Sequence, residues 1–310
     1  MNQNTILRDG IMLSAVFLLL MLVSLFIPIA GLVLMFFVPV PMALFTYKYG
    51  WPRGAVAASV LLLLLAVVLG PYAPAVVLLF AVPGIVFGAL YQKGEQPFAV
   101  YGGGVVALVS GITLTYVGVL LLTGTDPIEQ FQESLAESLE TTDEMMNLDS
   151  EEEVEQMTAW IDDLQTSAPA MFVIIGGVAG IIMQTAAAYF LRRRGASVPR
   201  FPPVREWSLP KPFIWYYLAV LILSFINISE GQEGMLHTVS ANLSPVMEGL
   251  MLIQGIAFIF FFCHWKGISK AVPVLAAISL LFIPFLVPIV RILGIIDLGF
   301  DLRTRLRSQE

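Results

Sequence analysis

Four polar side chains are the candidates for chemistry in this sequence, because they lie within or at the end of long apolar runs. They are Gln184, Glu248, Gln254 and Arg291. A charge at the centre of a membrane helix costs about 2.5–3.5 kcal/mol on insertion scales, so a charge inside a span is a candidate for function. We expect the glutamines to form hydrogen bonds between helices. Arg291 has three alternatives: an ion pair with Glu248, an ion pair with Asp297, or contact with the membrane interface.

Glu248 also has a simpler explanation. It follows Pro245 by about one turn at the start of an apolar run, so it would lie near the outer surface. A carboxylate there would stabilise the helix N-terminus through the helix dipole. We nevertheless keep all four side chains as ligand-binding candidates.

The sequence lacks the motifs of common enzyme classes. It contains no HExxH, GxSxG, Walker A or Cys/His metal spacing. His237 and His264 are isolated in the sequence. Cys263 is the single cysteine, so an internal disulfide is excluded. We therefore expect no catalytic activity, no cofactor and no metal site.

The composition defines the class of protein. The chain has 310 residues, of which 58% are hydrophobic and 13% are charged, and its mean hydropathy is +0.85. Soluble domains are about 45–50% apolar and about 25% charged. The apolar runs are long enough to cross a bilayer and lack the alternation of barrel strands, so they predict helices. The predicted fold is all-α: a polytopic transmembrane helical bundle of eight or nine spans. These are residues 11–29, 31–47, 54–70, 72–91, 98–123, 168–191, 212–229, 245–264 and 271–290.

Basic residues at every second junction predict the orientation of the first six spans. They place the N-terminus in the cytoplasm and residues 126–167 outside the membrane. They are not clustered with aromatic residues on a solvated face, so we expect no nucleic-acid partner. The basic residues concerned are Arg8, Lys48, Arg53, Lys93, Arg192, Arg193, Arg194, Arg200, Arg205 and Lys211.

The path of the last apolar segment has two alternatives. A ninth full crossing would leave Arg303, Arg305 and Arg307 outside, against the charge rule. Pro284 and Pro288 favour a break of residues 271–296 into a re-entrant or returning pair, since each proline removes a helical hydrogen bond. In the other alternative, residues 292–307 lie at the interface as an amphipathic helix.

Three regions follow from these patterns. Residues 1–194 form a six-span membrane core, and residues 195–212 form a cytoplasmic linker rich in proline and arginine. Residues 213–310 form a C-terminal membrane unit with an amphipathic tail. The linker composition is typical of an extended segment.

The segment 126–167 is an acidic insert with helical periodicity. It contains 14 acidic residues and neither lysine nor arginine. One apolar stripe is Ile128, Phe131, Leu135 and Leu139, and a second is Val154, Met157, Ile161 and Leu164. With Asp126 and Ser150 as N-caps, two amphipathic helices joined around Asn147 are predicted.

The surface on which these two helices pack stays open. Their apolar faces either pair with each other or lie on the membrane surface. A cap that captures a ligand or a divalent cation is the functional alternative. Because no EF-hand-like spacing is present, we favour a solvated acidic face.

Small residues at four-residue spacings predict close helix contacts. These pairs are Gly84 and Gly88, Ala107 and Gly111, Gly176 and Gly180, and Gly10 and Ser14. Proline breaks at Pro39 and Pro41 predict a discontinuous second span.

Three segments carry a family resemblance. Gly10-Ile-Met-Leu-Ser14-Ala15, Phe37-Val-Pro39-Val-Pro41 and the segment from Gly294 through Asp297 and Asp301 to Arg303 resemble the YybS family of bacterial membrane proteins. The likeness spans most of the chain outside the acidic insert. It implies a multi-pass protein of the bacterial cell membrane.

Residues 1–194 also resemble the substrate-binding S component of energy-coupling-factor transporters. In that family a small-residue motif on the first span docks onto a membrane coupling subunit that works with ATPases. Gly10, Ser14 and Ala15 occupy the matching place here, although the family pattern prefers two alanines. S components also gather polar ligand-binding side chains from spans four to six. Apart from Gln184, those spans here offer mainly Tyr101, Thr113 and Tyr116.

Two functions remain in competition. One is a binding subunit for uptake of a small molecule, with ligand capture at the outer end of spans four to six. The other is a scaffold without transport activity that gathers envelope or signalling partners, as the shape-determining membrane protein MreD does. In both, the lipid bilayer is a partner.

Overall fold

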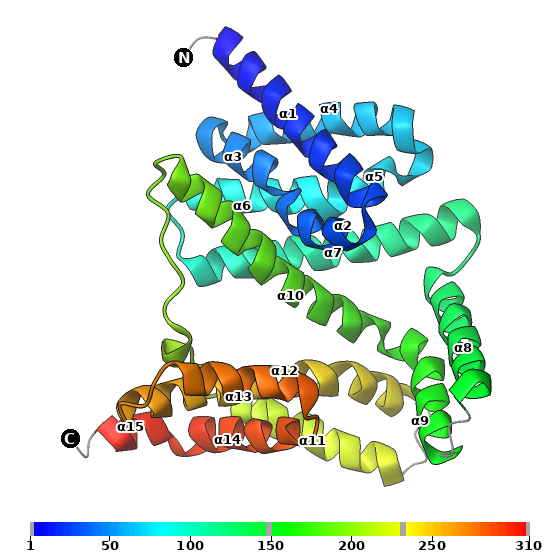
Figure 1. The fold of residues 1–310 in the computed structure, drawn as a ribbon, viewed down its shortest axis with the longest axis vertical. Coiled ribbons are helices and arrows are strands. Elements are labelled where there is room, and N and C mark those ends of the chain that lie inside the picture. The colour runs from blue at the N-terminus through cyan, green and yellow to red at the C-terminus, as the bar shows by residue number, and fades with distance from the viewer. Residues whose placement is uncertain (1–2, 147–150, 230–233, 308–310) are drawn as a thin grey trace. The chain divides into compact units, whose positions relative to one another are not determined.

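The described part of the chain, residues 3–146, 151–229 and 234–307 of a computed structural model, is helical and contains no strand. Figure 1 shows the course of these helices. This confirms the predicted all-α polytopic bundle. Two compact units are present. The N-terminal unit comprises Met1–Gln165 and Met171–Phe201, and the C-terminal unit comprises Thr166–Ala170 and Pro202–Glu310.

The N-terminal unit contains ten α-helices and three short irregular turns, except for Thr166–Ala170 of the tenth helix, which belong to the C-terminal unit. The helices are α1 (Gln3–Phe26), α2 (Pro28–Leu34), α3 (Val40–Tyr49), α4 (Trp51–Leu69), α5 (Ala73–Val76), α6 (Val82–Gln92), α7 (Pro97–Thr123), α8 (Pro127–Met146), α9 (Glu151–Asp162) and α10 (Leu164–Arg193). The turns are the 3₁₀ turns η1 (Met35–Phe37) and η2 (Gly70–Tyr72) and the π-turn η3 (Val77–Ala81).

The C-terminal unit contains five further helices and one 3₁₀ turn. They are η4 (Val204–Glu206), α11 (Phe213–Ser229), α12 (Gly234–Trp265), α13 (Ala271–Phe282), α14 (Leu286–Phe300) and α15 (Leu302–Arg307).

Six helical stretches among the described residues are long and apolar enough to cross a membrane. One of them, Trp51–Gln92, is 42 residues long and holds two of the predicted spans. The chain reverses at η2, where Gly70 has φ +55°, so α4 and α6 run in opposite directions (Figure 1). The other five are Gln3–Phe26, Ile29–Tyr49, Pro97–Thr123, Leu164–Arg193 and Gly234–Trp265.

The second span is discontinuous, as its prolines predict. η1 separates α2 from α3, and Pro39 precedes the first residue of α3. Two backbone carbonyl groups at the start of α3 and within it approach α6 closely. A Cβ atom on Gly84 would meet the carbonyl oxygen of Pro39, and one on Gly88 would meet that of Ala43. These two glycines therefore act as the small-residue pair that was predicted.

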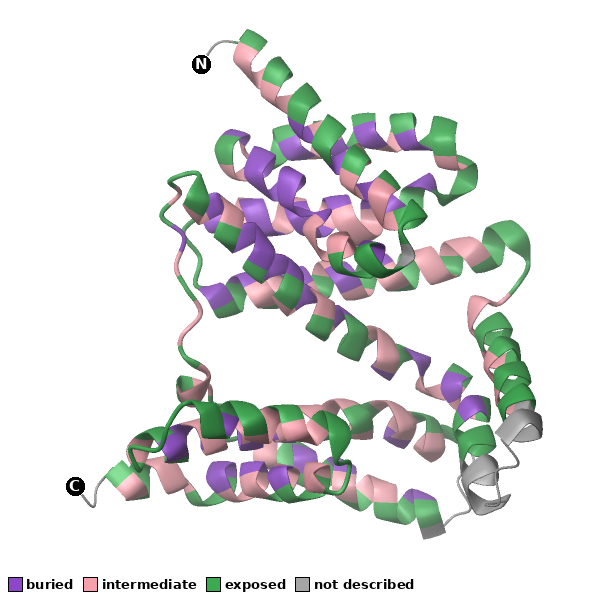
Figure 2. Ribbon diagram, viewed as in Figure 1, coloured by how far each residue is buried: buried purple, intermediate pink, exposed green. Residues whose placement is uncertain are grey.

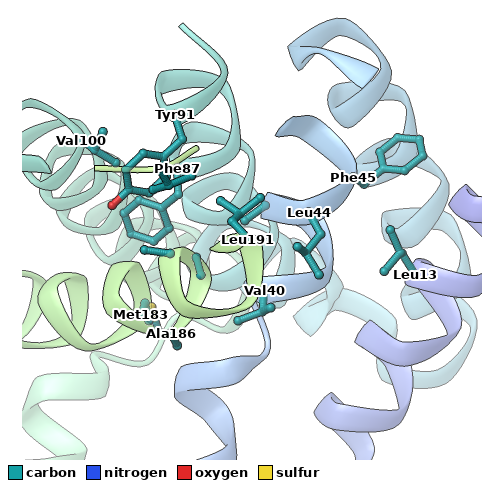
Figure 3. Close-up of a cluster of buried hydrophobic side chains, with 14 of the residues drawn as sticks. Leu13, Val40, Leu44, Phe45, Phe87, Tyr91, Val100, Met183, Ala186 and Leu191 are labelled. Carbon is teal, nitrogen blue, oxygen red and sulfur yellow. The ribbon is translucent and has the colours of Figure 1, made fainter. Parts of the chain in front are cut away.

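The core of the N-terminal unit gathers side chains from five of its helices. Figure 3 shows Phe87 and Tyr91 of α6 beside Met183 of α10, with Val100 of α7 near them. Lipid tails are as apolar as these side chains, so the cluster is stabilised by close van der Waals packing more than by exclusion from solvent. Leu13 of α1 and the α3 residues Val40, Leu44 and Phe45 extend the same cluster.

Several basic junctions of the N-terminal unit lie at one end of its bundle. Asp9 accepts hydrogen bonds from Lys48 Nζ and from Tyr49 Oη, each at 2.6 Å. Gln92 Nε2 donates to the carbonyl oxygen of Tyr47 at 2.9 Å. The start of α1 and the ends of α3 and α6 therefore meet, in agreement with the alternating charge pattern of the sequence.

The acidic insert forms the two predicted helices, α8 and α9. Asp126 is the N-cap of α8, since its Oδ1 accepts a hydrogen bond from Ile128 N at 2.8 Å. Gln132 of α8 donates to the carbonyl oxygen of Ile161 at 2.6 Å, and α8 packs against α9. The two helices therefore contact each other. Phe131 and Met157 of the two apolar stripes are each 52% exposed, so both alternatives for the apolar faces stay predictions. The predicted cap Ser150 and the joint at Asn147 lie outside the described residues.

The segment 271–290 is not a single crossing. The helix breaks between α13 and α14, around Pro284, and the chain reverses direction there. α14 therefore lies beside α12 and runs in the same direction as α12 (Figure 1). α13 has 12 residues, so it is about 18 Å long and shorter than a bilayer core of about 30 Å. This agrees with the returning arrangement. Residues 292–300 belong to α14, so the alternative of one interfacial helix over 292–307 is wrong.

α12 is longer than predicted. It begins at Gly234, not near residue 245, and Pro245 lies inside it. Glu248 therefore lies near the middle of a 32-residue helix and not at its N-terminus. The simpler explanation for Glu248, in which it stabilises a helix N-terminus, does not hold.

The linker 195–212 differs from the extended segment that its composition indicates. Its residues from Pro202 onward belong to the C-terminal unit. They include η4 and a hydrogen bond of 2.9 Å from Trp207 Nε1 to the carbonyl oxygen of Pro202. The second half of the linker is therefore a packed element.

Two glycines set the distance between α12 and α14. A Cβ atom on Gly255 would meet the carbonyl oxygen of Val290, and one on Gly294 would meet that of Met251. The buried residues of α14 include Val290, Gly294 and Leu298, which are four residues apart and therefore share one face of that helix. Figure 2 shows how buried and exposed residues are distributed over the helices. Backbone contact thus replaces side-chain interdigitation at this helix pair.

We predict that Gly255→Ala lowers the stability of the C-terminal unit by roughly 1–3 kcal/mol, because the new methyl group overpacks the backbone of α14. Thermal unfolding of the full chain in nanodiscs measures this change. Gly249→Ala on the same helix is the control, since a Cβ atom there meets nothing within 4 Å. Equal stability of the two variants would contradict the close contact.

We also predict that Asp126→Ala loosens the first turn of α8. Loss of an N-cap costs roughly 1 kcal/mol, which corresponds to about fivefold faster hydrogen exchange at Ile128. The pKa of the Asp126 carboxyl is below its ordinary value, chiefly because the Ile128 N–H donates to it. Its contribution is therefore complete above the unfolded pKa of about 3.9 and decreases as the pH falls through the lower folded value.

Asp126→Asn is the matched control for this measurement, since it keeps an acceptor at the N-cap but has no titrating group. Its exchange rate, corrected for intrinsic chemistry, should not respond to acid. If the parent chain and Asp126→Asn respond identically, the pH prediction fails.

Candidate functional site

Glu248 and Arg291 form an ion pair between α12 and α14. Arg291 Nη1 contacts Glu248 Oε2, and the side chains are 24% and 48% exposed, respectively. Of the three alternatives for Arg291, the structure therefore contains the pair with Glu248. Both residues lie on apolar helices, where an unpaired charge would be costly. An ion pair between two helices here is a stronger functional candidate than either residue alone.

A groove of about 160 Å³ lies beside this pair, between α11 and α12. Glu248 and Ser244 of α12 form its polar side. Its α11 side is mainly apolar and carries one hydroxyl from serine and one from tyrosine. The α11 residues that line it are Tyr217, Val220, Leu221, Ser224, Phe225 and Ile228.

Three serine hydroxyls are joined beside the groove. Ser224 Oγ lies 3.0 Å from Ser240 Oγ and 2.8 Å from Ser244 Oγ. Ser224 Oγ also donates to the carbonyl oxygen of Val220 at 3.0 Å. His237, Ser240, Ser244 and Glu248 follow one another at helical spacings of three, four and four residues. One face of α12 is therefore polar from its first turn to its middle.

Gln254 belongs to a different polar network, at the end of the C-terminal unit where basic residues gather. Its Nε2 donates to Asp297 Oδ2 at 2.6 Å, and its Oε1 accepts from Leu209 N at 2.9 Å. Arg303 Nε donates to the same Asp297 oxygen at 2.9 Å. Asp297 is only 3% exposed, so its charge is balanced by Arg303 inside the unit.

Arg303 extends this network to the linker. Its Nη1 donates to the carbonyl oxygens of Arg205 and Trp207 at 2.9 and 2.8 Å. The guanidinium also lies over the ring of Phe261, 5.5 Å from its centroid. Arg303 and Asp297 therefore fasten the linker to α12 and α14. This is a structural role, and it explains why Gln254 does not face the groove.

Gln184 lies in the N-terminal unit and is fully buried there. Its Nε2 donates to Tyr91 Oη and to the carbonyl oxygen of Pro97, both at 2.8 Å. It joins α10 to α6 and to the start of α7, as expected for a hydrogen bond between helices. The four candidates are thus divided: Glu248 and Arg291 share one site, whereas Gln254 and Gln184 belong to separate networks.

The other polar residues suggested by the S-component resemblance are not gathered around a groove. Tyr101 Oη donates to the carbonyl oxygen of Gly177 at 3.1 Å. Tyr116 Oη donates to Asp126 Oδ2 at 3.0 Å, and Thr113 is exposed. Two of these side chains therefore connect α7 with α10 and with the cap of α8.

The small residues of α1 point in different directions. Gly10 lies against the ring of Phe45, where an added Cβ atom would be 3.4 Å from Phe45 Cε2. Ser14 is half-buried and Ala15 is exposed. Gly10 is therefore used for packing of α1 on α3, and only Ala15 lies on the free face of the helix.

No group of three or more His, Cys, Asp or Glu side chains that could hold a metal ion occurs within the described ranges 3–146, 151–229 and 234–307. In α8 the described acidic residues Glu129, Glu133 and Glu137 are exposed. The described part of the insert thus presents a solvated acidic surface.

The serine residues of the groove and the role of Arg303 were not predicted from the sequence. Ser240 and Ser244 have a detectable signal, since they share a helical face with Glu248 once α12 is known to begin at Gly234. The partnership of Arg303 with carbonyl groups of the linker has no comparable signal in the sequence. Backbone acceptors carry no side-chain type that a pattern can detect.

Comparison with known proteins identifies the family. The family model described as "Predicted membrane protein (DUF2232)" matches residues 15–298. The uncharacterized protein YybS of Bacillus subtilis (strain 168) is 28% identical over 312 residues, covering 99% of this chain and 100% of that protein. The predicted resemblance to the YybS family is confirmed. No solved structure matches.

We predict that Arg303→Gln destabilises the C-terminal unit by roughly 3–5 kcal/mol, because it leaves the buried Asp297 carboxylate without its cation. Thermal unfolding in nanodiscs gives the loss, and faster proteolysis near Arg205 reports release of the linker. Combining Asp297→Asn with Arg303→Gln should recover part of the stability, since the unpaired charge is removed. If the double variant is less stable than the single one, the ion pair does not have this role.

Proposed function

We propose that this chain, which belongs to the DUF2232 family of predicted membrane proteins, is a substrate-binding subunit for small-molecule uptake. Its ligand would bind in the groove between α11 and α12. The observation that carries this proposal is the Glu248–Arg291 ion pair, in which Glu248 lies on a candidate membrane span and lines that groove. Charges within apolar helices are costly, and they often mark pathways or sites for polar ligands.

The groove has the features of a small binding site. Its wall is mostly apolar, and its few polar groups lie together on one side. The proposed site differs from the place expected from S components, at the outer end of spans four to six. The hydrogen bonds of Gln184 and Tyr101 support this relocation, because Gln184 Nε2 and Tyr101 Oη already donate to partners within the N-terminal unit.

We propose that the protein lies in the bacterial cell membrane with its N-terminus in the cytoplasm and residues 126–167 outside. Lys48 bonds to Asp9 near the start of α1, Arg53 donates to the Tyr49 carbonyl oxygen at the end of α3, and Lys93 follows Gln92, which bonds to Tyr47. The gathering of basic residues at this end of the bundle supports the orientation. The acidic insert follows the opposite end of α7. In the C-terminal unit, the returning helix α14 brings Arg303 to the end of α12 that precedes Lys266, which satisfies the same charge rule.

Uptake would also require partner proteins. The chain has no Walker A sequence, so energy would come from separate ATPases through a coupling subunit of the energy-coupling-factor type. The exposed face of α1, with Ile11, Ala15 and Leu19, is the surface proposed for that subunit. Gly10 would support this face indirectly through its contact with Phe45. The proposal includes no catalytic step, cofactor or nucleic-acid partner.

One observation favours a second function, a scaffold of the MreD type. Several polar side chains of α6, α7 and α10 in the N-terminal unit hold helices together. Such a unit would act through its surface and not through a ligand. The two functions differ in whether a small molecule accompanies the purified protein.

We predict that native mass spectrometry of the full chain in nanodiscs detects a co-purifying small molecule, and that Ser244→Leu reduces its occupancy at least tenfold by filling the groove. Ser279→Leu on α13 is the control, because Ser279 does not line the groove. A pull-down should recover coupling and ATPase subunits. Absence of any small molecule, with an envelope protein recovered instead, would overturn the uptake proposal in favour of the scaffold.

A further inference from the structure

One hydrogen bond determines the direction of the others in the serine cluster. Ser224 Oγ donates its hydrogen to the carbonyl oxygen of Val220. A hydroxyl has one hydrogen and two lone pairs, so Ser224 accepts the bonds from Ser240 and Ser244. Ser240 and Ser244 therefore direct their hydrogens to Ser224. The oxygen of Ser244, which lines the groove, keeps its lone pairs for a ligand.

Glu248 adds a second acceptor on the same helical face. An ionised carboxylate accepts hydrogen bonds and donates none. Its Oε2 contacts Arg291, whereas the side chain as a whole is 48% exposed and lines the groove. Ser244 and Glu248 are four residues apart, so both project to the same side of α12. The α12 side of the groove thus offers oxygen acceptors to a ligand.

The charged and acceptor groups beside the groove favour some donor groups of a ligand over others. Arg291 contacts Glu248 but is not among the residues that line the groove. A ligand in the groove therefore meets the carboxylate and not the guanidinium. A carboxylate ligand has no donor for these acceptors, and an alcohol would supply one. A primary ammonium supplies three donors and a positive charge.

The rest of the groove suits a short hydrocarbon chain. Val220, Leu221, Phe225 and Ile228 form its apolar wall. A volume of about 160 Å³ corresponds to about five water-sized groups of about 30 Å³ each. The aromatic ring of Phe225 would also attract a cation near its face.

We infer that the groove between α11 and α12 binds a small primary alkylammonium ion, with the ammonium at Ser244 and Glu248 and the alkyl chain along α11. This inference rests on the proposed function and names the ligand class of that site. Glu248 is shared between Arg291 and the ligand, so the carboxylate keeps its contact with Arg291 while it accepts a hydrogen bond from the ammonium.

Saturation-transfer NMR tests the inference on the full chain in nanodiscs with three probes of equal chain length. They are n-butylammonium, n-butanol and butanoate, and empty nanodiscs give the background from lipid. We expect n-butylammonium to bind at least tenfold more tightly than the other two. Glu248→Gln should weaken its binding by about 10- to 100-fold, the range for a hydrogen bond to a charged group.

Because Glu248→Gln also leaves Arg291 without its partner, a second variant is needed. Ser244→Ala removes one acceptor and keeps the ion pair, so we expect weaker n-butylammonium binding by about 3- to 10-fold. Ser279→Ala is the matched control, since the Ser279 hydroxyl donates to Ala276 within α13, away from the groove. It should leave the binding unchanged.

Each other outcome overturns the inference. If n-butanol or butanoate binds more tightly than n-butylammonium and Ser244→Ala weakens that binding, the groove is a site for another ligand class and the proposed function stands. If none of the probes exceeds the background of empty nanodiscs, the ammonium site is rejected, and the co-purification experiment decides the proposed function separately. Unchanged n-butylammonium binding in Ser244→Ala and Glu248→Gln would place its site elsewhere.

Discussion

Close packing of α14 against α12 is the contact on which the C-terminal unit depends. Gly255 and Gly294 bring the two backbones together. In this register Glu248 meets Arg291, and Gln254 meets Asp297. Apolar surfaces gain little from association in lipid, so close backbone approach and polar pairs provide the attraction between helices. The packing of α14 on α12 therefore positions both the Glu248–Arg291 ion pair and the network that holds the linker.

The turn at Pro284 makes this packing possible. It returns α14 alongside α12, where a continuous ninth span would have carried Arg291 and Arg303 away from their partners. The same turn reconciles the C-terminal arginines with the charge rule. A proline that interrupts helical hydrogen bonding therefore has consequences for both topology and chemistry.

The sequence predicts those parts of the fold that depend on local composition. Hydropathy locates the membrane helices, prolines locate the breaks, and the stripes of the insert give α8 and α9. The N-cap Asp126 is also detectable, because its oxygen bonds a neighbour two residues away. The start of α12 is missed because its first turns are more polar and are stabilised by contacts with α11 and Thr166, such as the 2.8 Å bond from Asn242 Nδ2 to the Thr166 carbonyl oxygen.

Part of the site is beyond prediction for a similar reason. Glu248 and Arg291 are recognisable as unusual charges, and their pairing was one of three alternatives. The sequence does not decide among the three, because the choice depends on the register between α12 and α14. That register is set by two glycines on different helices, which form no motif along the chain. The groove follows from the position of α11, which only the tertiary structure provides.

A charge exchange between α12 and α14 tests the central claim, that these helices pack in the register that pairs residues 248 and 291. Glu248→Arg and Arg291→Glu are made singly and together, and thermal unfolding of each full chain is measured in nanodiscs. We predict that each single change lowers stability, because two like charges then meet, and that the double change recovers most of the loss. A double variant whose loss equals the sum of the two single losses would contradict the account.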